Sequence, residues 1–326
     1  MPMPGHHLPC FERYAEGKGI CPLFQSKGAE FSWDQLTPQL VWRGTDFLFL
    51  PLQTRLVRPS FGEYVVDDPN IDQYEAVTEN LKQNFLNFLP RWKGVVLTAE
   101  SEIKARRTGT LPKVNIKFAA TRGGGHAAIG ADEYREWESI GFPVAGEKMS
   151  REELATFKYH IDIGGGGGTT WTGTTEKLAM PGLLFHHETA TKDYIHDQLK
   201  PWVHYVPVNS DLTDVMEKLE WAESHPSEAK AIAENAAELM KSLSTLEGFE
   251  PLFKQQLVEP LRKVIEAYNP MMLRDDDAWN DAFESLGGNE LFTPFMECID
   301  QGCIPLEGAK DYDERYPDRK ISIKIN

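Results

Sequence analysis

The sequence predicts a doubly wound α/β fold, in which helices cover both faces of a parallel sheet, and three observations support this. Between about Leu40 and Pro270, short apolar runs alternate with stretches of helical periodicity. The runs are continuously apolar instead of alternating with polar residues, as is typical of parallel strands buried on both faces. One of them ends in a glycine-rich segment that leads into a helix, which is where open α/β sheets bind ligands.

Five segments read as strands of a Rossmann-like sheet because turn residues bound each of them. They are residues 94–99, 114–119, 157–163, 183–187 and 204–208. Residues 1–40 are rich in glycine and proline and show no clear period, so we expect an irregular segment there. We expect the folded domain to span residues 41–270 and an acidic extension to span residues 271–326.

Helices are predicted between and after these strands. Ser150 and Glu153 have the spacing of a capping box. Asp211 is expected to cap a helix whose apolar side chains recur with helical spacing: Leu212, Val215, Met216 and Leu219. Pro226 interrupts the chain, and a second amphipathic helix is expected to follow it, with one apolar face formed by Ala229, Ile232, Ala233, Ala236, Leu239 and Met240.

Composition limits the partners. The formal net charge of −16 argues against nucleic-acid binding, which requires clustered lysine and arginine. No apolar run approaches the roughly 20 residues that a membrane helix needs. The first ten residues lack the apolar core of a signal peptide, so we expect either a cytosolic protein or a fragment that has lost its targeting segment. The four cysteines, Cys10, Cys21, Cys298 and Cys303, fit no zinc motif and leave two terminal disulfides or four thiols as alternatives.

The glycine-rich segment is the strongest signal for a binding site. It follows His160-Ile161-Asp162-Ile163 and consists of Gly164, Gly165, Gly166, Gly167, Gly168, Thr169, Thr170 and Trp171. Glycines allow a backbone to approach a ligand closely, and a helix that begins after them directs free N–H groups toward an anion. The segment lacks the Gly-Lys-Ser/Thr ending of a P-loop. Its alternative interpretation is a flexible connector without a ligand.

Other residues near predicted strand ends have the chemistry to assist. Arg43, with Gly44 and Thr45, suits a diphosphate, although a surface ion pair is the alternative for a single arginine. Glu188 follows a strand and is placed to accept hydrogen bonds from a ribose. Asp162 is expected to organise the glycine-rich segment or to act as a simple cap.

His186 and His187 are neighbours on a predicted strand. Adjacent strand residues point to opposite faces, so the two rings are not expected to bind one metal, and a buried structural role is the alternative for either. We predict no metal site and no cofactor.

Two segments resemble the capsule-type glycosyltransferases, glycosyltransferase family 90. This family includes fungal capsule xylosyltransferases and the protein O-glucosyltransferases of the secretory pathway. The first segment is Leu-Lys-Pro-Trp-Val-His-Tyr-Val-Pro-Val at residues 199–208, followed by Ser210-Asp211-Leu212. The second, Trp42-Arg43-Gly44-Thr45, is similar to the aromatic-Arg-Gly-Ser/Thr element of the family. The resemblance covers roughly residues 30–250.

The resemblance implies a GT-B-type donor domain and inverting transfer of glucose or xylose from a UDP-sugar to a hydroxyl of a protein or glycan acceptor. It implies that Arg43 and Thr45 contact the donor diphosphate, and that the segment from Gly164 to Thr170 cradles the nucleotide sugar. It also implies the lumen of the endoplasmic reticulum or Golgi, if a signal segment is missing from this chain.

Two departures from the family pattern concern the chemistry. In the O-glucosyltransferases the glycine-rich turn is followed by a Ser-x-Arg element, but no arginine occupies Gly173 or Thr174 here, which leaves Lys177 as a substitute. The catalytic aspartate of the family lies upstream of the Arg-Gly-Ser/Thr element, in an acceptor-side domain that we expect to be truncated or missing. Asp46 and Asp162 are then candidates for the catalytic base only because they adjoin the donor motifs.

Two other functions are compatible with the sequence. A dehydrogenase would need an acidic residue on its second strand to hold the adenine ribose, and the sequence has no clean example of one. A degenerate module that binds a nucleotide sugar without turnover is the second alternative.

Overall fold

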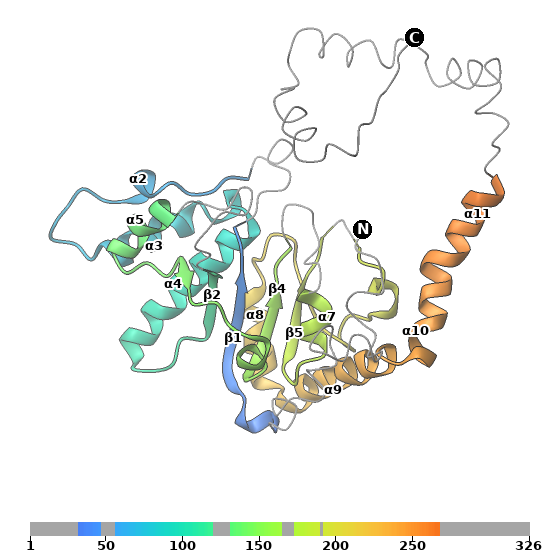
Figure 1. Ribbon diagram of the computed structural model, residues 1–326. Helices are drawn as coiled ribbons and strands as arrows, with labels where there is room; N and C mark the ends of the chain where they lie inside the picture. Colours follow the sequence, from blue (N-terminus) through green and yellow to red (C-terminus); the bar gives the residue numbers. More distant parts are fainter. Residues whose placement is uncertain (1–31, 47–55, 120–130, 165–172, 190–191, 268–326) are drawn as a thin grey trace, which may run out of the picture. The chain divides into compact units, whose positions relative to one another are not determined.

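The computed structural model describes residues 32–46, 56–119, 131–164, 173–189 and 192–267 (Figure 1). The chain divides into two compact units, Met1–Leu257 and Val258–Asn326. The described part of the second unit contains the helix α11 (Glu259–Ala267). The predicted glycine run from Gly165 to Thr170, Trp171, all four cysteines and the acidic extension lie outside the described residues.

A six-stranded sheet forms the centre of the first unit. Its strands are β1 (Thr37–Gly44), β2 (Val114–Ala119), β3 (Ala145–Gly146), β4 (Phe157–Asp162), β5 (Leu183–His187) and β6 (Val206–Val208). Their order is β3-β2-β1-β4-β5-β6, and every neighbouring pair is parallel. The predicted doubly wound parallel sheet is therefore confirmed.

Helices connect the strands and continue beyond the sheet. They are α2 (Phe61–Tyr64), α3 (Gln73–Gln83), α4 (Pro90–Thr108), α5 (Ala131–Ser139), α6 (Arg151–Leu154), α7 (Gly173–Leu178), α8 (Val215–Ser224), α9 (Pro226–Leu243) and α10 (Leu246–Phe253). Shorter helical turns occupy Trp33–Gln35, Phe85–Asn87, His196–Gln198 and Lys254–Val258.

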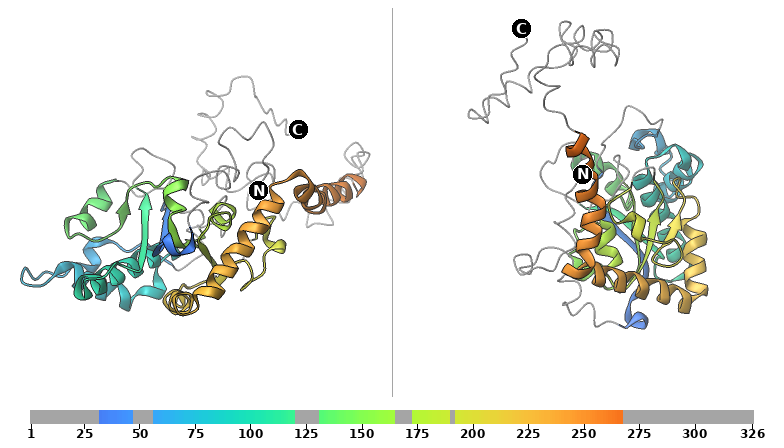
Figure 2. Two further views of the ribbon diagram at one scale, coloured as in Figure 1. Left: turned by 90° about the horizontal axis from the view of Figure 1, so that it is seen from below. Right: turned by 90° about the vertical axis from the view of Figure 1, so that its right-hand side faces the viewer.

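Side chains alternate between two apolar clusters, one on each face of the sheet. Leu40 and Trp42 of β1, with Phe185 of β5, belong to the larger cluster, which also contains residues of α4 and α8. Leu184 belongs to the smaller cluster with residues of α7 and of the second half of α9. Figure 2 shows the sheet with helices on both sides, as burial of both faces of a parallel sheet requires.

Residues 94–99 were predicted to form a strand, and this prediction is wrong. They lie inside α4, which begins with Pro90 at its first position and ends before Gly109 in the left-handed conformation at φ 67°. A short apolar run cannot be assigned to helix or strand by periodicity alone when the segment is buried on all sides. All six of these residues are buried, so the run has no polar face that would reveal the helical period.

Two strands were not predicted. β1 begins at Thr37, inside the stretch expected to be irregular, and β3 has only two residues. The strand predicted at 204–208 is shorter than expected, since β6 consists of Val206–Val208.

The predicted cap at Asp211 is also wrong. The residue before α8 is Asp214, and Leu212 lies outside the helix in a left-handed conformation at φ 59°. Asp211 instead accepts hydrogen bonds from the backbone and side chain of Thr213. The capping box of Ser150 and Glu153 is confirmed, as is the helix that follows the break at Pro226.

Candidate functional site

The site lies where the strand order reverses direction. β1 is flanked by β2 on one side and by β4 on the other, so the connections that leave the carboxyl ends of β1 and β4 diverge. In open parallel sheets this divergence leaves a crevice outside the strand ends, and ligands bind there. Gly44, Thr45 and Asp46 follow β1, and Ile163 and Gly164 follow β4.

Arg91 links the chain that follows β1 to the chain that follows β4. It lies in the first turn of α4, and its guanidinium donates to the carbonyl oxygen of Thr45 at 2.6 Å and to that of Ile163 at 3.4 Å. Its Cζ lies 5.3 Å from the centroid of the Trp42 ring. Burial lowers the pKa of Arg91 to about 10, against the opposing charge of Asp46, so the guanidinium is protonated at neutral pH.

The sequence analysis missed Arg91 because it assigned the following apolar run to a strand. The available signal was Pro90, since proline favours the first position of a helix and would have placed Arg91 at a helix N-terminus. The start of a 19-residue helix beside two strand ends supplies free N–H groups and a partial positive charge at the same place.

Gly44 is needed for the close approach of an aromatic ring. A Cβ atom at this position would lie 2.3 Å from the Trp42 side chain, much closer than real contacts allow. The absence of a side chain at Gly44 therefore lets the indole of Trp42 lie along the strand end, where Arg91 covers it.

Asp46 is buried, at 3% exposure, and is engaged by other side chains. Its Oδ2 lies 2.9 Å from Arg58 Nε and accepts from the indole N–H of Trp92 at 3.1 Å. Burial raises the pKa of Asp46, while Arg58, the Trp92 hydrogen bond and Arg91 oppose this rise. These contacts fasten the chain after β1 to α4, and they occupy the carboxylate that was a candidate base.

Arg43 makes its contacts on the β2 side of β1. Its guanidinium donates to the carbonyl oxygens of Glu147, Trp42 and Asn115 and to the side chain of Asn115. These contacts, apart from that to the adjacent Trp42, belong to β2 and to the chain that follows β3, whereas Gly164 follows β4 on the other side of β1. The structure thus brings Arg91, and not Arg43, to the start of the glycine-rich segment.

Asp162 joins β4, β5 and α7. The fully buried carboxylate accepts from Thr174 Oγ1 at 2.6 Å, from the backbone N–H of His187 at 3.2 Å, and lies 2.7 Å from His186 Nδ1. Burial raises the pKa of Asp162, but His186 and the hydrogen bonds outweigh this and hold it below its usual range. For His186, burial lowers the pKa, but the neighbouring Asp162 carboxylate outweighs this effect and the pKa is raised.

The two adjacent histidines point to opposite faces, as predicted. His186 contacts Asp162, and its ring lies near those of His196 and Tyr205, with centroid distances of 5.3 and 4.9 Å. His187 Nδ1 instead accepts from the backbone N–H of Gly164 at 3.2 Å, and its Nε2 lies 2.9 Å from the carbonyl oxygen of Ser210. The described residues contain no group of three or more histidine, cysteine, aspartate or glutamate side chains suited to a metal ion.

Lys177 and Glu188 differ in solvent exposure: Lys177 is buried and Glu188 is exposed. Lys177 is 8% exposed, donates to the Gly173 carbonyl at 3.4 Å and has a pKa lowered by burial, with Asp162 opposing. It therefore lies in the buried network beneath α7. Glu188 is exposed directly after β5, where its backbone N–H donates to the carbonyl oxygen of Val208. Its predicted contact with a ribose stays a prediction.

Lys93 is a second cation in the first turns of α4. Its side chain is 2% exposed, and its Nζ lies 5.6 Å from the centroid of the Phe85 ring. No hydrogen bond or ion pair of its ammonium group is found within the described part of the chain, although its charge acts on Asp211 and His187. Burial lowers the pKa of Lys93, and Asp211 opposes this.

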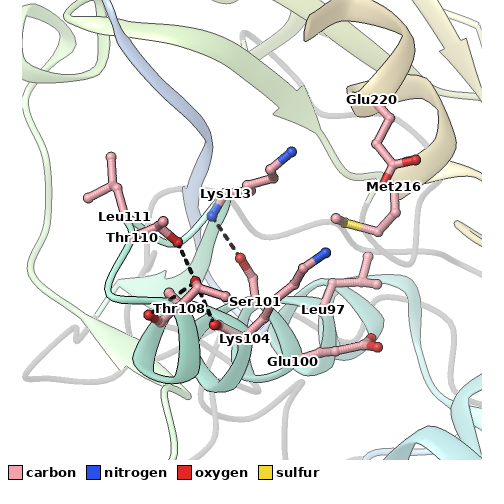
Figure 3. Close-up of a pocket in the computed structure, with 11 residues that line it drawn as sticks. Leu97, Glu100, Ser101, Lys104, Thr108, Thr110, Leu111, Lys113, Met216 and Glu220 are labelled. Carbon is pink, nitrogen blue, oxygen red and sulfur yellow. Dashed lines mark hydrogen bonds between the residues drawn. The ribbon is translucent and has the colours of Figure 1, made fainter. Parts of the chain in front are cut away.

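A cavity of about 230 Å³ lies elsewhere in the same unit (Figure 3). It is lined by the second half of α4, by the residues that lead into β2 and by α8, among them Ser101, Lys104, Lys113 and Glu220. Lys113 precedes the amino end of β2, so this cavity is at the opposite edge of the sheet from Arg91. None of the predicted site residues lines it.

The arrangement defines a doubly wound α/β domain with Arg91 and a helix N-terminus at the carboxyl ends of β1 and β4, and comparison with known proteins shows what the chain is similar to. Residues 132–247 match the family described as Glycosyl transferase family 90, so the resemblance drawn from the sequence is confirmed over this segment.

The relatives with known names are protein O-glucosyltransferases. Protein O-glucosyltransferase 2 of Danio rerio is 39% identical over 178 residues, which cover 51% of this chain and 34% of that protein. Protein O-glucosyltransferase 1 of Homo sapiens is 37% identical over 60 residues, or 18% of this chain and 15% of that protein. Protein O-glucosyltransferase 3 of Rattus norvegicus is 33% identical over 79 residues, which cover 24% of this chain and 15% of that protein. The chain thus spans about a third or less of the length of these relatives.

Proposed function

We propose that this chain carries the donor-binding part of an inverting glycosyltransferase. It binds a UDP-sugar of the glucose or xylose class and transfers the sugar to a hydroxyl of a protein or glycan. The single observation that carries the proposal is the position of Arg91, which links the ends of β1 and β4 where the strand order reverses. The family match and the O-glucosyltransferase relatives support the choice of a sugar nucleotide as the ligand of this edge.

The proposed chemistry places the donor diphosphate between Thr45, Arg91 and the N–H groups that follow β4. In an inverting transfer the acceptor hydroxyl attacks the anomeric carbon as the bond to the diphosphate breaks, and negative charge develops on the leaving group. A fixed guanidinium and a helix N-terminus stabilise that charge without reorganising. The UDP-sugar is a co-substrate, and the proposed reaction uses no cofactor.

Arg91 rather than Arg43 is assigned the main contact with the diphosphate. Arg43 has its donors engaged by Glu147, Trp42 and Asn115, so a role in donor binding would require it to leave these partners. Arg91 donates one N–H group to the Thr45 carbonyl and two to that of Ile163, so two of its five N–H groups have no acceptor among the described residues.

One observation favours a second function, a nucleotide-sugar-binding module without turnover. The two candidate bases are both committed, Asp46 to Arg58 and Trp92, and Asp162 to His186 and Thr174. In this second reading neither of these two carboxylates deprotonates the acceptor hydroxyl.

Calorimetric titration with UDP tests the binding site. We expect Arg91→Gln to weaken UDP binding about 10- to 100-fold, since a hydrogen bond to a charged group contributes about 1.5–3 kcal/mol. Arg107→Gln is the matched control, because Arg107 lies at the other end of α4 and pairs with the exposed Glu75. Thermal unfolding verifies that Arg91→Gln is folded. If the folded variant binds UDP as tightly as the wild type, Arg91 does not contact the diphosphate and the assignment is refuted.

A second measurement separates enzyme from binding module. Incubation with UDP-glucose or UDP-xylose and a peptide or glycan acceptor yields a glycosylated acceptor and UDP if the chain is catalytic. Binding of UDP without product supports the module.

A further inference from the structure

The hydrogen bonds of His187 define its protonation state. The ring is 4% exposed, and its Nδ1 accepts from the backbone N–H of Gly164, which can only donate. Nε2 lies 2.9 Å from the Ser210 carbonyl oxygen, which can only accept, so Nε2 must carry the proton. His187 is therefore a neutral imidazole with its proton on Nε2.

The groups around the ring favour this neutral form. Burial and the charges of His186 on β5 and Lys93 on α4 lower the pKa of His187, while the Ser210 carbonyl and Asp162 on β4 raise it. The net effect is a lowered pKa, which keeps Nδ1 free to accept at neutral pH.

Ser210 belongs to a strained turn at the carboxyl end of β6. Leu212 has a left-handed backbone at φ 59°, an uncommon conformation for a residue of its size. Hydrogen bonds from Leu212 N–H to the Asn209 carbonyl and from Asn209 N–H to Asp214 hold the turn. Strained backbone of this kind is found preferentially at binding sites and requires surrounding contacts that maintain it.

We propose that His187 is a positioning residue for donor binding. Its neutral ring joins Gly164, the first residue of the glycine-rich segment, to the strained turn at Ser210, and so fixes the ends of β4 and β6 across β5. This inference rests on the proposed function, in which those strand ends form the edge that holds the nucleotide.

Nuclear magnetic resonance of imidazole ¹⁵N tests the protonation state in the ligand-free protein. We expect His187 Nδ1 to resonate as an unprotonated nitrogen and Nε2 as a protonated one at pH 7. A protonated Nδ1 would overturn the inference.

Two substitutions then separate the hydrogen bonds. In His187→Asn the side-chain carbonyl oxygen can take the place of Nδ1 and accept the hydrogen bond from the Gly164 N–H. The leucine side chain of His187→Leu has no acceptor, so this hydrogen bond is lost. UDP titrations are expected to show affinity reduced about tenfold in His187→Leu, the magnitude of one lost buried hydrogen bond, and largely retained in His187→Asn.

A structural role alone predicts a different result. It would lower the unfolding temperature of His187→Leu while leaving the UDP affinity of the folded protein equal to that of the wild type, and this outcome overturns the inference alone. Failure of the wild type to bind UDP overturns the proposed function and the inference together, so the two failures are distinguishable.

Discussion

His160 and Asp162 lie two residues apart on β4 and are both fully buried, yet their environments favour opposite charge states. Asp162 has three hydrogen-bonding partners, one of which is the ring of His186, and these hold its pKa below the usual range, so its carboxylate stays charged. Neither ring nitrogen of His160 has a partner within the described residues, and burial, helped by Lys177, lowers its pKa to about 3. The strand β4 thus carries a neutral imidazole, that of His160, and a charged carboxylate, that of Asp162.

The first prediction concerns His160 and acid stability. Its folded-state pKa of about 3 lies below the ordinary value of 6.5, so the unfolded chain binds the proton more tightly. The free energy of unfolding of the wild type should therefore fall as pH drops from 6.5 toward 3. In His160→Leu this part of the pH dependence should be absent when urea unfolding is measured at pH 7, 5 and 4. His225→Gln, which removes an exposed histidine, should keep the wild-type dependence, and an unchanged slope in His160→Leu would contradict the prediction.

The second prediction concerns the pair formed by Asp162 and His186. Asp162→Asn should destabilise the protein by about 3–5 kcal/mol, because it removes the buried carboxylate that pairs with His186 and accepts from Thr174 and from the His187 N–H. Thr174→Val, which removes one hydrogen bond to the same carboxylate, should cost only about 1 kcal/mol. The contribution of the pair is lost as pH falls through the lowered pKa of Asp162 and as pH rises through the raised pKa of His186. Denaturant unfolding that ranks the two variants in reverse order would refute this reading.

At the scale of elements, α4 accounts for most of what the sequence did not reveal. Strands flanked by turn residues were predictable, and β2 and β5 match their predicted bounds. The apolar run from Gly94 to Ala99 was not, because burial on all sides removes the polar residues that mark a helical period. Because the start of α4 was not predicted, the position of Arg91 in its first turn was not predicted either. That Asp162 lies at a strand end could be predicted since it adjoins the glycines, whereas the direction of the Arg43 side chain depends on Asn115, a residue distant in sequence.

Gly94 shows how closely α4 packs on the sheet, and it provides a third prediction. A Cβ atom there would lie 2.5 Å from Ile116 Cγ2 and 3.0 Å from Ile163 Cδ1. Gly94→Ala should therefore destabilise the protein by about 1–3 kcal/mol, the usual cost of overpacking, although alanine favours a helix. Gly62→Ala is the control, because nothing lies within 4 Å of its added Cβ. Thermal unfolding that finds Gly94→Ala as stable as the wild type would refute the packing.

The contact between β1 and α4 leads to a fourth prediction. Alanine at Gly44 would displace the Trp42 ring, on which Arg91 lies, and so move the guanidinium. Gly44→Ala should weaken UDP binding several-fold in calorimetric titration, with a smaller effect than Arg91→Gln. Wild-type affinity in Gly44→Ala would show that the ring does not position Arg91.

At the scale of the whole molecule, an acidic protein is proposed to bind an acidic ligand. The formal net charge is −16, so attraction to a diphosphate must come from a local concentration of positive charge. Arg91, Lys93 and the start of α4 supply it at one edge of the sheet. No helix in the described residues is long and apolar enough to cross a membrane.

The position of UDP in a crystal of its complex with this protein tests the central claim most directly. We predict density for the diphosphate outside the carboxyl ends of β1 and β4, within hydrogen-bonding distance of the Arg91 guanidinium and near Gly164. Density in the cavity between α4 and α8, or at any site that leaves Arg91 bound only to Thr45 and Ile163, would contradict the account.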